Sequence, residues 1–174
     1  PPHFRLELEV LLQDLEIGRG TLIDSGCGIG VVANALARTF ATVKAVDFSA
    51  TGLAAAAALK DLQPNVEFFE ADIVDWMEQT PPQSADVILD LFTSSAIEPN
   101  RTVALFRNYA RQLAPDGVVI VAVNEKAPQK NMSFHSRFNL FGPDETETQL
   151  KDAGYSVEPF SYKGGTFLVA RIKR

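Results

Sequence analysis

Residues 21–30 read TLIDSGCGIG, an apolar run that leads through an aspartate into three glycines at alternate positions. The apolar run is typical of a short strand, and residues 31–39 after it are typical of a helix. The glycines allow a sharp turn between the two and let a ligand approach the backbone closely. This stretch therefore predicts a strand, a glycine turn and a helix, the unit from which α/β proteins are built.

Strands and helices continue to alternate along the rest of the chain. Strands are predicted at residues 42–46, 66–69, 85–91 and 118–123, and helices at residues 4–17, 50–62, 99–113 and 143–154, with a helical turn at residues 76–77. Residues 155–162 and 166–172 are predicted to form two more strands, and the three-residue joint between them requires antiparallel pairing. We therefore expect an α/β fold in three layers, with a seven-stranded, mostly parallel sheet and an antiparallel C-terminal strand pair.

Length and charge restrict the organisation and the partners. The 174 residues correspond to one domain, residues 1–174, in which an N-terminal helix within residues 1–17 precedes a core at residues 21–174. With 16 basic and 22 acidic side chains the net charge is −6, which disfavours nucleic acid and favours a small-molecule partner. The oligomeric state stays open.

Cysteine content and apolar runs lead to further expectations. One cysteine and two histidines are too few for a structural zinc site, so no metal is expected. The longest apolar stretches, residues 53–59 and 118–123, are far shorter than the roughly 20 residues of a membrane span. We therefore expect no membrane association and a cytoplasmic location.

Four aspartates share one position relative to the predicted strands. Asp24, Asp47, Asp72 and Asp90 each lie at or just past the carboxyl end of a strand. Ligands of open α/β sheets bind beyond this edge. These carboxylates are therefore the candidate binding residues.

Charge separates two candidate ligands of the glycine turn. Residues 28–33 fit the G-x-G-x-x-A pattern of dinucleotide-binding loops, and Asp47 lies about twenty residues further on, so NAD is one alternative. The diphosphate of a dinucleotide is disfavoured beside the Asp24 carboxylate. S-adenosylmethionine instead presents an ammonium, a sulfonium and two ribose hydroxyls, which suit Asp24 and Asp47. Charge favours the sulfonium ligand, and a turn that binds nothing is the remaining alternative.

Five segments in order resemble the motifs of class I S-adenosylmethionine-dependent methyltransferases. They are DSGCGIG at residues 24–30, AVDFS at 45–49, EADIVDW at 70–76, DVILDLFTS at 86–94 and LAPDGVVIVAV at 113–123. The last segment departs from the family pattern, because Asp116-Gly117 stands where two glycines are more usual. The resemblance covers residues 21–172 and implies a Rossmann-like sandwich, S-adenosylmethionine as cofactor and S-adenosylhomocysteine as product.

The resemblance also implies a role for individual residues. Around the methionine moiety it places the backbone of Gly26, Cys27 and Gly28, with Gly30 in the same loop, Asp24 close by, and Asp90 and Leu91 opening towards the substrate. Around the nucleoside it places Asp47 on the ribose hydroxyls, Phe48 against adenine, Asp72 on the adenine amino group and Ile73 with its backbone amide.

Simpler alternatives remain for three of these residues. Asp72 also suits a helix N-cap, and Phe48 also suits a core position. Cys27 lies at a helix N-terminus, where a thiol becomes more nucleophilic. Because no histidine is near Cys27 in the sequence, contact through its backbone is the expectation.

The substrate side is indicated less specifically. Residues 90–95, DLFTSS, lack the Asn/Asp-Pro-Pro-aromatic motif of nucleic-acid amino methyltransferases and are similar to the LFTS segment of small methyltransferases that act on metabolites. The substrate-side candidates are Phe92, Thr93 and Ser94 in the loop at residues 92–97, the first helix, and Arg137 from the aperiodic residues 126–141. His135 in that segment is a candidate general base, with a solvated surface histidine as the alternative.

The expected activity is methyl transfer from S-adenosylmethionine to a small-molecule acceptor by in-line displacement. Aminopropyltransferases share the fold, but they usually carry an N-terminal β domain and further acids for a polyamine, and neither is evident. A non-catalytic S-adenosylmethionine-binding scaffold is a further alternative, because transfer by proximity requires no invariant catalytic residue. The acceptor and its reacting atom stay open.

Overall fold

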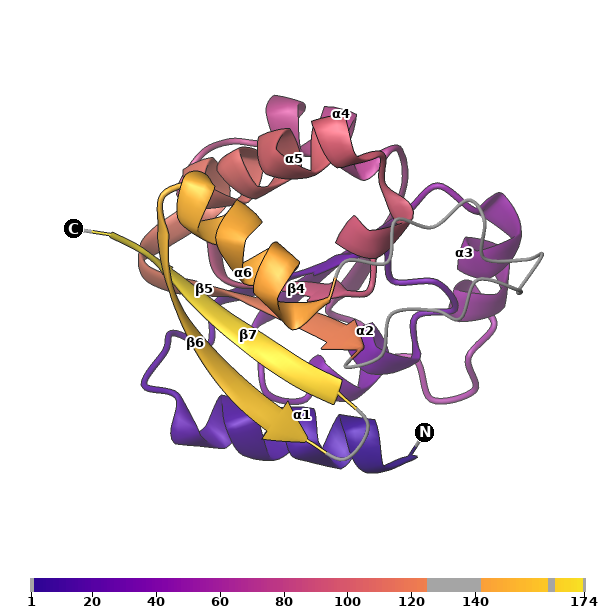
Figure 1. Cartoon of the computed structure of the whole chain (residues 1–174). Coiled ribbons are helices and arrows are strands. Elements are labelled where there is room, and N and C mark those ends of the chain that lie inside the picture. Colours follow the sequence, from indigo (N-terminus) through magenta and orange to yellow (C-terminus); the bar gives the residue numbers. More distant parts are fainter. Residues whose placement is uncertain (1, 125–141, 163–164, 174) are drawn as a thin grey trace, which may run out of the picture.

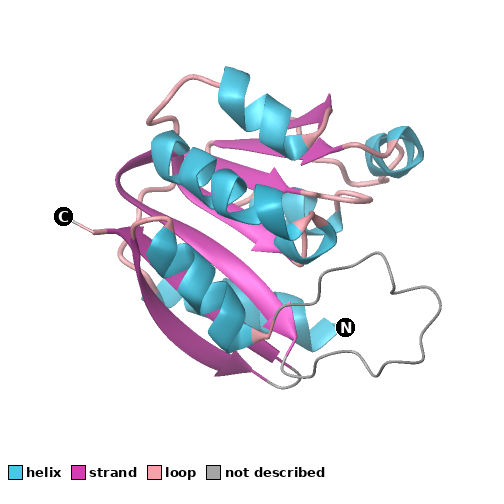
Figure 2. Ribbon diagram, turned by 45° about the horizontal axis from the view of Figure 1, so that its top comes forward, coloured by secondary structure: helices cyan, strands magenta, loops and turns pink. Residues whose placement is uncertain are grey.

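The computed structural model describes residues 2–124, 142–162 and 165–173. Within these ranges the chain forms a seven-stranded sheet flanked by helices (Figures 1 and 2). The strands are β1 (Thr21–Ser25), β2 (Thr42–Asp47), β3 (Val66–Glu70), β4 (Ala85–Leu91), β5 (Leu113–Asn124), β6 (Tyr155–Tyr162) and β7 (Gly165–Ile172). The helices are α1 (Pro2–Asp14), α2 (Val31–Leu36), α3 (Ala50–Ala57), α4 (Ile73–Gln79), α5 (Pro99–Gln112) and α6 (Pro143–Asp152), with a short 3₁₀ helix η1 (Ser94–Ala96).

The sheet has the strand order β3-β2-β1-β4-β5-β7-β6. Strands β1 to β5 pair in parallel, whereas β7 runs antiparallel to both β5 and β6. The predicted α/β fold with a mostly parallel sheet and an antiparallel C-terminal pair is therefore confirmed.

Helices cover both faces of the sheet, because the central strands are apolar on both sides. Along β5, Val119 and Val121 pack in a core with α4, α5 and α6, whereas Val118 and Ile120 pack in a second core with α1 and α2. Successive side chains of a strand point to opposite faces, so a continuous apolar run needs cover on both. Figure 1 shows α4, α5 and α6 on one side of the sheet and α1 on the other.

The helix predicted at residues 50–62 is shorter than expected and ends at Ala57. Beyond it the backbone makes bonds of the tighter i to i−3 type, such as Leu59 N–H to the carbonyl of Ala56. Asn34 on α2 holds the following turn, since its amide donates to the carbonyl of Asp61 and accepts from the N–H of Gln63. These tertiary bonds replace the last helical turns that the alanine-rich sequence predicted.

Strand β5 begins at Leu113 and not at the predicted residue 118. Leu113 pairs with Ala85, and the register shifts between Ala85 and Val87. Gly117 makes this close pairing feasible, because a Cβ there would lie 2.9 Å from the carbonyl oxygen of Ala85. Residues 113–117, which lie before the predicted strand, therefore also extend the sheet.

Parallel pairing brings the carboxyl ends of β1, β2 and β4 to one edge of the sheet. Ser25, Asp47 and Leu91 are the last residues of these strands.

Among the described residues, no helix combines the length and apolar character that a membrane crossing requires.

We expect Gly30→Ala to lower the free energy of unfolding by about 1–3 kcal/mol, measured by urea denaturation. Gly30 has φ +70°, and a Cβ there would lie 2.8 Å from Cβ of Ala56 and 3.0 Å from the Phe68 ring. Gly142→Ala is the matched control: its φ is −72° and a Cβ would meet open space, so a change within about 0.5 kcal/mol is expected. Equal losses in the two variants would contradict this account of Gly30.

Candidate functional site

A pocket of about 450 Å³ lies at the carboxyl edge of the parallel strands. Its lining comes from the ends of β1, β2 and β4 and from the beginnings of α4 and α5. The residues are Gly26, Val46, Asp47, Phe48, Ala71, Asp72, Ile73, Leu91, Phe92, Thr93, Ala96, Ile97, Glu98 and Arg101. Three acidic side chains and one basic side chain belong to this set, so the described lining is net negative.

The glycine loop is fastened to the end of β2 by backbone hydrogen bonds. The N–H groups of Gly26 and Cys27 both donate to the carbonyl of Val46, at 2.8 and 3.0 Å. The N–H of Gly28 donates to Oδ2 of Asp47 at 2.7 Å, and the N–H of Ser49 donates to Oδ1 at 2.8 Å. One carboxylate therefore sets the relative position of the loop and of the segment after β2.

The three glycines of the loop have different structural roles, although all have positive φ. A Cβ at Gly26 would overlap the Thr93 side chain, and a Cβ at Gly30 would overlap Ala56 and Phe68. A Cβ at Gly28 would meet no atom within 4 Å. Space beside the backbone is therefore left at Gly28, whereas glycine at positions 26 and 30 is required by packing within the protein.

Asp24 at the end of β1 is a buried carboxyl with an unsatisfied oxygen. Its relative exposure is 1%, and Oδ2 has no hydrogen-bond partner. Burial, together with the charges of Asp47 and Asp90, raises the pKa of Asp24 to about 7, although the backbone N–H of Ala33 acts in the opposite direction. A cation near this carboxyl would favour its ionised form.

Asp90 at the end of β4 belongs to a buried network with Ser25, Ser94 and Tyr109. Oδ1 accepts from both the N–H and the hydroxyl of Ser94, at 2.9 and 3.1 Å. The Tyr109 hydroxyl lies 3.1 Å from Oδ2 of Asp90 and 2.5 Å from Oγ of Ser25. Burial raises the pKa of Asp90 to about 6, and these hydrogen bonds limit the rise. The network joins the ends of β1 and β4 to α5.

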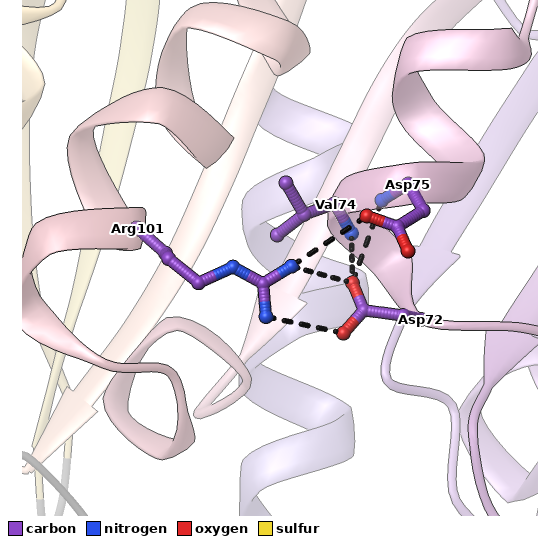
Figure 3. A network of polar contacts seen from close by, with 4 residues as sticks. All are labelled: Asp72, Val74, Asp75 and Arg101. Atoms are coloured by element: carbon purple, nitrogen blue, oxygen red, sulfur yellow. Dashed lines mark hydrogen bonds and ion pairs between the residues drawn. The ribbon is translucent and has the colours of Figure 1, made fainter.

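Asp72 is the N-cap of α4 and also pairs with Arg101 on α5 (Figure 3). Oδ1 accepts from the N–H groups of Val74 and Asp75, and the Arg101 guanidinium reaches both carboxylate oxygens. Partial burial raises the pKa of Asp72, but the Arg101 guanidinium and the two N–H groups more than offset this and lower it below its ordinary value. The helix-cap interpretation is therefore correct for the structure, and the carboxylate is already ionised.

Two phenylalanines shape the rim of the pocket. Phe48 is 82% exposed, so the alternative that it fills the core is wrong. Phe92 has φ +71°, a conformation that a bulky residue rarely adopts. The neighbouring bonds, Ser95 Oγ to the Phe92 carbonyl and Thr93 Oγ1 to the Ser25 carbonyl, are both 2.5 Å. They hold this turn against the end of β1.

The structure brings together most of the residues that the sequence indicated. Gly26, Asp47, Phe48, Asp72, Ile73, Leu91, Phe92 and Thr93 line the pocket. Cys27, Gly28, Asp90 and Ser94 are next to lining residues along the chain or bonded to them. Asp24 lies two residues before Gly26 and Gly30 lies four residues after it, and none of these six residues is part of the lining. His135 and Arg137 lie outside the described residues.

Sequence reasoning missed the part of the pocket formed just before α5 and by its first turn. Glu98 and Arg101 line it, as do Val46 and Ala71 at two other strand ends, whereas Ala96 and Ile97 lie in the candidate loop at residues 92–97. The rule that ligands bind in the loops after parallel strands would have pointed to residues 98–101 as well. The expected Phe92 to Ile97 loop contains the η1 helix, which was not predicted.

Cys27 does not have the environment of a nucleophile. Burial, with the charges of Asp24 and Asp47, raises the pKa of the thiol to about 12. A neutral thiol is a poor nucleophile, which agrees with the expected contact through its backbone.

Within the described part of the chain, no group of His, Cys, Asp or Glu side chains is arranged to hold a metal ion.

Two methyltransferases are similar to the chain in sequence. The cypemycin N-terminal methyltransferase of a Streptomyces species is 33% identical over 162 residues, which is 86% of this chain and 63% of that protein. The malonyl-[acyl-carrier protein] O-methyltransferase of Halalkalibacterium halodurans is 28% identical over 139 residues, 76% of this chain and 42% of that protein. The chain thus spans less than two thirds of the length of each relative.

Solved structures share the fold. The PH0226 protein from Pyrococcus horikoshii superposes with a TM-score of 0.80 at 22% identity, covering 98% of this chain and 91% of that one. The DhpI protein in its complex with SAH superposes with a TM-score of 0.76 at 23% identity, covering 98% and 86%. These likenesses confirm the expected Rossmann-like fold.

The sequence profile of a family described as a methyltransferase domain matches residues 22–117. The match begins in β1 and ends in β5, so it contains the glycine loop and all four strand-end aspartates. Because it spans more than half of the chain, the chain belongs to this methyltransferase-domain family.

Proposed function

We propose that the protein binds S-adenosylmethionine in the 450 Å³ pocket and transfers its methyl group to a small-molecule acceptor, leaving S-adenosylhomocysteine. The observation that carries the proposal is the position of Asp47. Its carboxylate lies on the pocket wall, and each oxygen is oriented by one backbone N–H. Each oxygen keeps a further acceptor position, which suits the two adjacent hydroxyls of a ribose.

The nucleoside half of the cofactor suits the pocket between Phe48 and the start of α4. The exposed Phe48 ring offers a face on which adenine stacks. Asp72 and Ile73 line the same pocket and supply a carboxylate and a backbone N–H for the base edge. These contacts are part of the proposal.

The methionine half suits the loop at Gly28 and the carboxyl of Asp24. Gly28 leaves open space where a Cβ would stand, so a ligand can approach its backbone. Oδ2 of Asp24 is buried without a partner, and an ammonium brought near it would satisfy that oxygen and favour its ionised state. Gly26, Cys27 and Gly30 shape this loop, and Asp90 supports it through Ser25 and Tyr109.

The protein's contribution to the reaction is proposed to be positioning. When bound, the sulfonium supplies an activated methyl group: the acceptor's lone pair forms the new bond to carbon while the carbon–sulfur pair stays on the neutral thioether. Leu91, Phe92 and Thr93 form the wall that would orient the acceptor in line, with Ser94 fixed behind them by Asp90. A well-oriented acceptor gains a large effective concentration, so a strong base is optional.

Family membership supports methyl transfer over the other candidates, which were NAD binding, aminopropyl transfer and a non-catalytic scaffold. Titration calorimetry with S-adenosylmethionine and with NAD tests the binding step. Incubation with methyl-labelled S-adenosylmethionine and pools of metabolites tests the transfer. Tight NAD binding without heat from S-adenosylmethionine would contradict the proposal, and cofactor binding without transfer to any acceptor would favour a scaffold.

Asp47→Ala is expected to weaken S-adenosylmethionine binding by about 1.5–3 kcal/mol, or roughly 10- to 150-fold in Kd, because charge-assisted bonds to two hydroxyls are lost. Calorimetry on the folded variant measures this. The control is Asp61→Ala, which removes an exposed acid outside the pocket lining and leaves Kd unchanged. An unaltered Kd in Asp47→Ala would mean that Asp47 does not hold the ribose.

Phe48→Ala is expected to weaken cofactor binding by about 1–2 kcal/mol, because base stacking on the ring is lost. Its thermal stability should stay the same, since the ring is 82% exposed. Val10→Ala, on an α1 residue that is 56% exposed, serves as a matched loss of surface apolar area. If Phe48→Ala lowers the melting temperature but not the affinity, the ring supports the fold and not adenine.

Asp24→Asn is expected to change the pH dependence of stability. A carboxyl whose pKa is raised from 3.8 to about 7 stays protonated up to a higher pH in the folded state than in the unfolded state. The free energy of unfolding therefore falls as pH rises from about 4 to about 7. The variant should lack this part of the fall. Its free energy of unfolding should exceed that of the wild type by on the order of 1–3 kcal/mol at pH 7.5, and by less at pH 4.5. Urea denaturation at several pH values measures both, and parallel curves for the two proteins would refute the raised pKa.

A further inference from the structure

The carboxylate of Asp72 has most of its hydrogen-bonding capacity occupied inside the protein. Oδ1 accepts from the N–H of Val74 at 2.8 Å, from the N–H of Asp75 at 3.4 Å and from Nη2 of Arg101 at 3.1 Å. Oδ2 accepts only from Nη1 of Arg101, at 3.3 Å, among the bonds of this carboxylate. A carboxylate oxygen has two acceptor positions, so Oδ2 keeps one for a ligand.

Arg101 holds this arrangement from the opposite wall of the pocket. It lies in the first turn of α5, while Asp72 precedes α4, and both line the pocket. Figure 3 shows the guanidinium facing the Asp72 carboxylate, with Asp75 beside it. Two N–H donors from one planar fork reach both oxygens and fix the plane of the carboxylate, which the two backbone bonds to Oδ1 alone would leave free to rotate.

The ion pair contributes little to the stability of the fold. The side chains of Arg101 and Asp72 are 41% and 45% exposed, and pairs at such exposure are worth little. A cation in the first turn of a helix is also unfavourable with respect to the helix dipole. The consequence of the pair is therefore geometric: it determines where Oδ2 of Asp72 presents its free acceptor.

We propose that Arg101 is a positioning residue for base recognition: it orients Asp72 so that Oδ2 accepts from the exocyclic amino group of the cofactor's adenine. This rests on the proposed function. A base with a carbonyl at that position would present an acceptor to a carboxylate, and the two would repel each other. Arg101 thus determines how strongly the pocket prefers a 6-amino base, without touching that base itself.

The test compares S-adenosylhomocysteine with S-inosylhomocysteine, whose base has a carbonyl in place of the exocyclic amino group and an N–H in place of the neighbouring ring-nitrogen acceptor. Calorimetry gives both dissociation constants for the wild type, Arg101→Met, Arg101→Lys and Asp72→Asn. Arg107→Met, an exposed arginine on the same helix and outside the pocket lining, is the matched control. Melting temperatures within about 2 °C of the wild type are expected for the Arg101 variants, because the pair is exposed.

The wild type and Arg107→Met should prefer the adenosyl ligand by at least about tenfold, the effect of one charge-assisted hydrogen bond. In Arg101→Met the preference should fall to about threefold or less, chiefly through weaker binding of the adenosyl ligand. Arg101→Lys should be intermediate, since a lysine keeps the charge but not the fork. Asp72→Asn should lose the preference as well.

Three results would overturn the inference. An unchanged ratio in Arg101→Met, whether both ligands bind as before or weaken equally, would leave Arg101 with a structural role only. An unchanged ratio in Asp72→Asn would show that another group recognises the base, while the proposed function stands. Failure of the wild type to bind S-adenosylhomocysteine would overturn the proposed function, and the inference with it.

Discussion

The rest of the structure depends on one constraint: the central strands β1, β4 and β5 are apolar on both faces, so both faces must be covered by helices. Each helix therefore returns the chain to the opposite end of the sheet, and the strands pair in parallel. Parallel pairing places the carboxyl ends of β1 to β5 on one edge. The pocket and its polar side chains lie at that edge, where ligands of open α/β sheets bind.

Bringing four strand-end aspartates towards one edge causes repulsion between their negative charges, and each carboxyl group has a different set of hydrogen-bond partners. Asp47 is held by two backbone N–H groups, Asp72 by a helix N-terminus and Arg101, and Asp90 by two hydroxyls and an N–H. Asp24 alone keeps a buried oxygen without a partner. An environment that raises the pKa of two buried acids is also one in which a cationic ligand is favoured.

Where sequence prediction failed, contacts between distant segments had overridden local preference. The alanine-rich segment after residue 50 favours a long helix, yet the helix ends at Ala57 and Asn34 holds the following turn through Asp61 and Gln63. Strand β5 starts early because Leu113 pairs with Ala85. The roles of the loop glycines also depended on their neighbours: Gly28 faces open space, whereas Gly26 and Gly30 make room for Thr93, Ala56 and Phe68.

The sequence by itself determined the alternation of strands and helices, the antiparallel C-terminal pair and the aspartates at the strand ends, because periodicity, glycines and strand boundaries are local properties. It could not determine which carboxylates are satisfied within the protein. Arg101 lies 29 residues from Asp72 and meets it only when α4 and α5 pack together. The tertiary structure decided which aspartates are hydrogen-bonded within the protein and which keep a free oxygen, because burial and hydrogen-bond partners come from segments that only the folded sheet brings together.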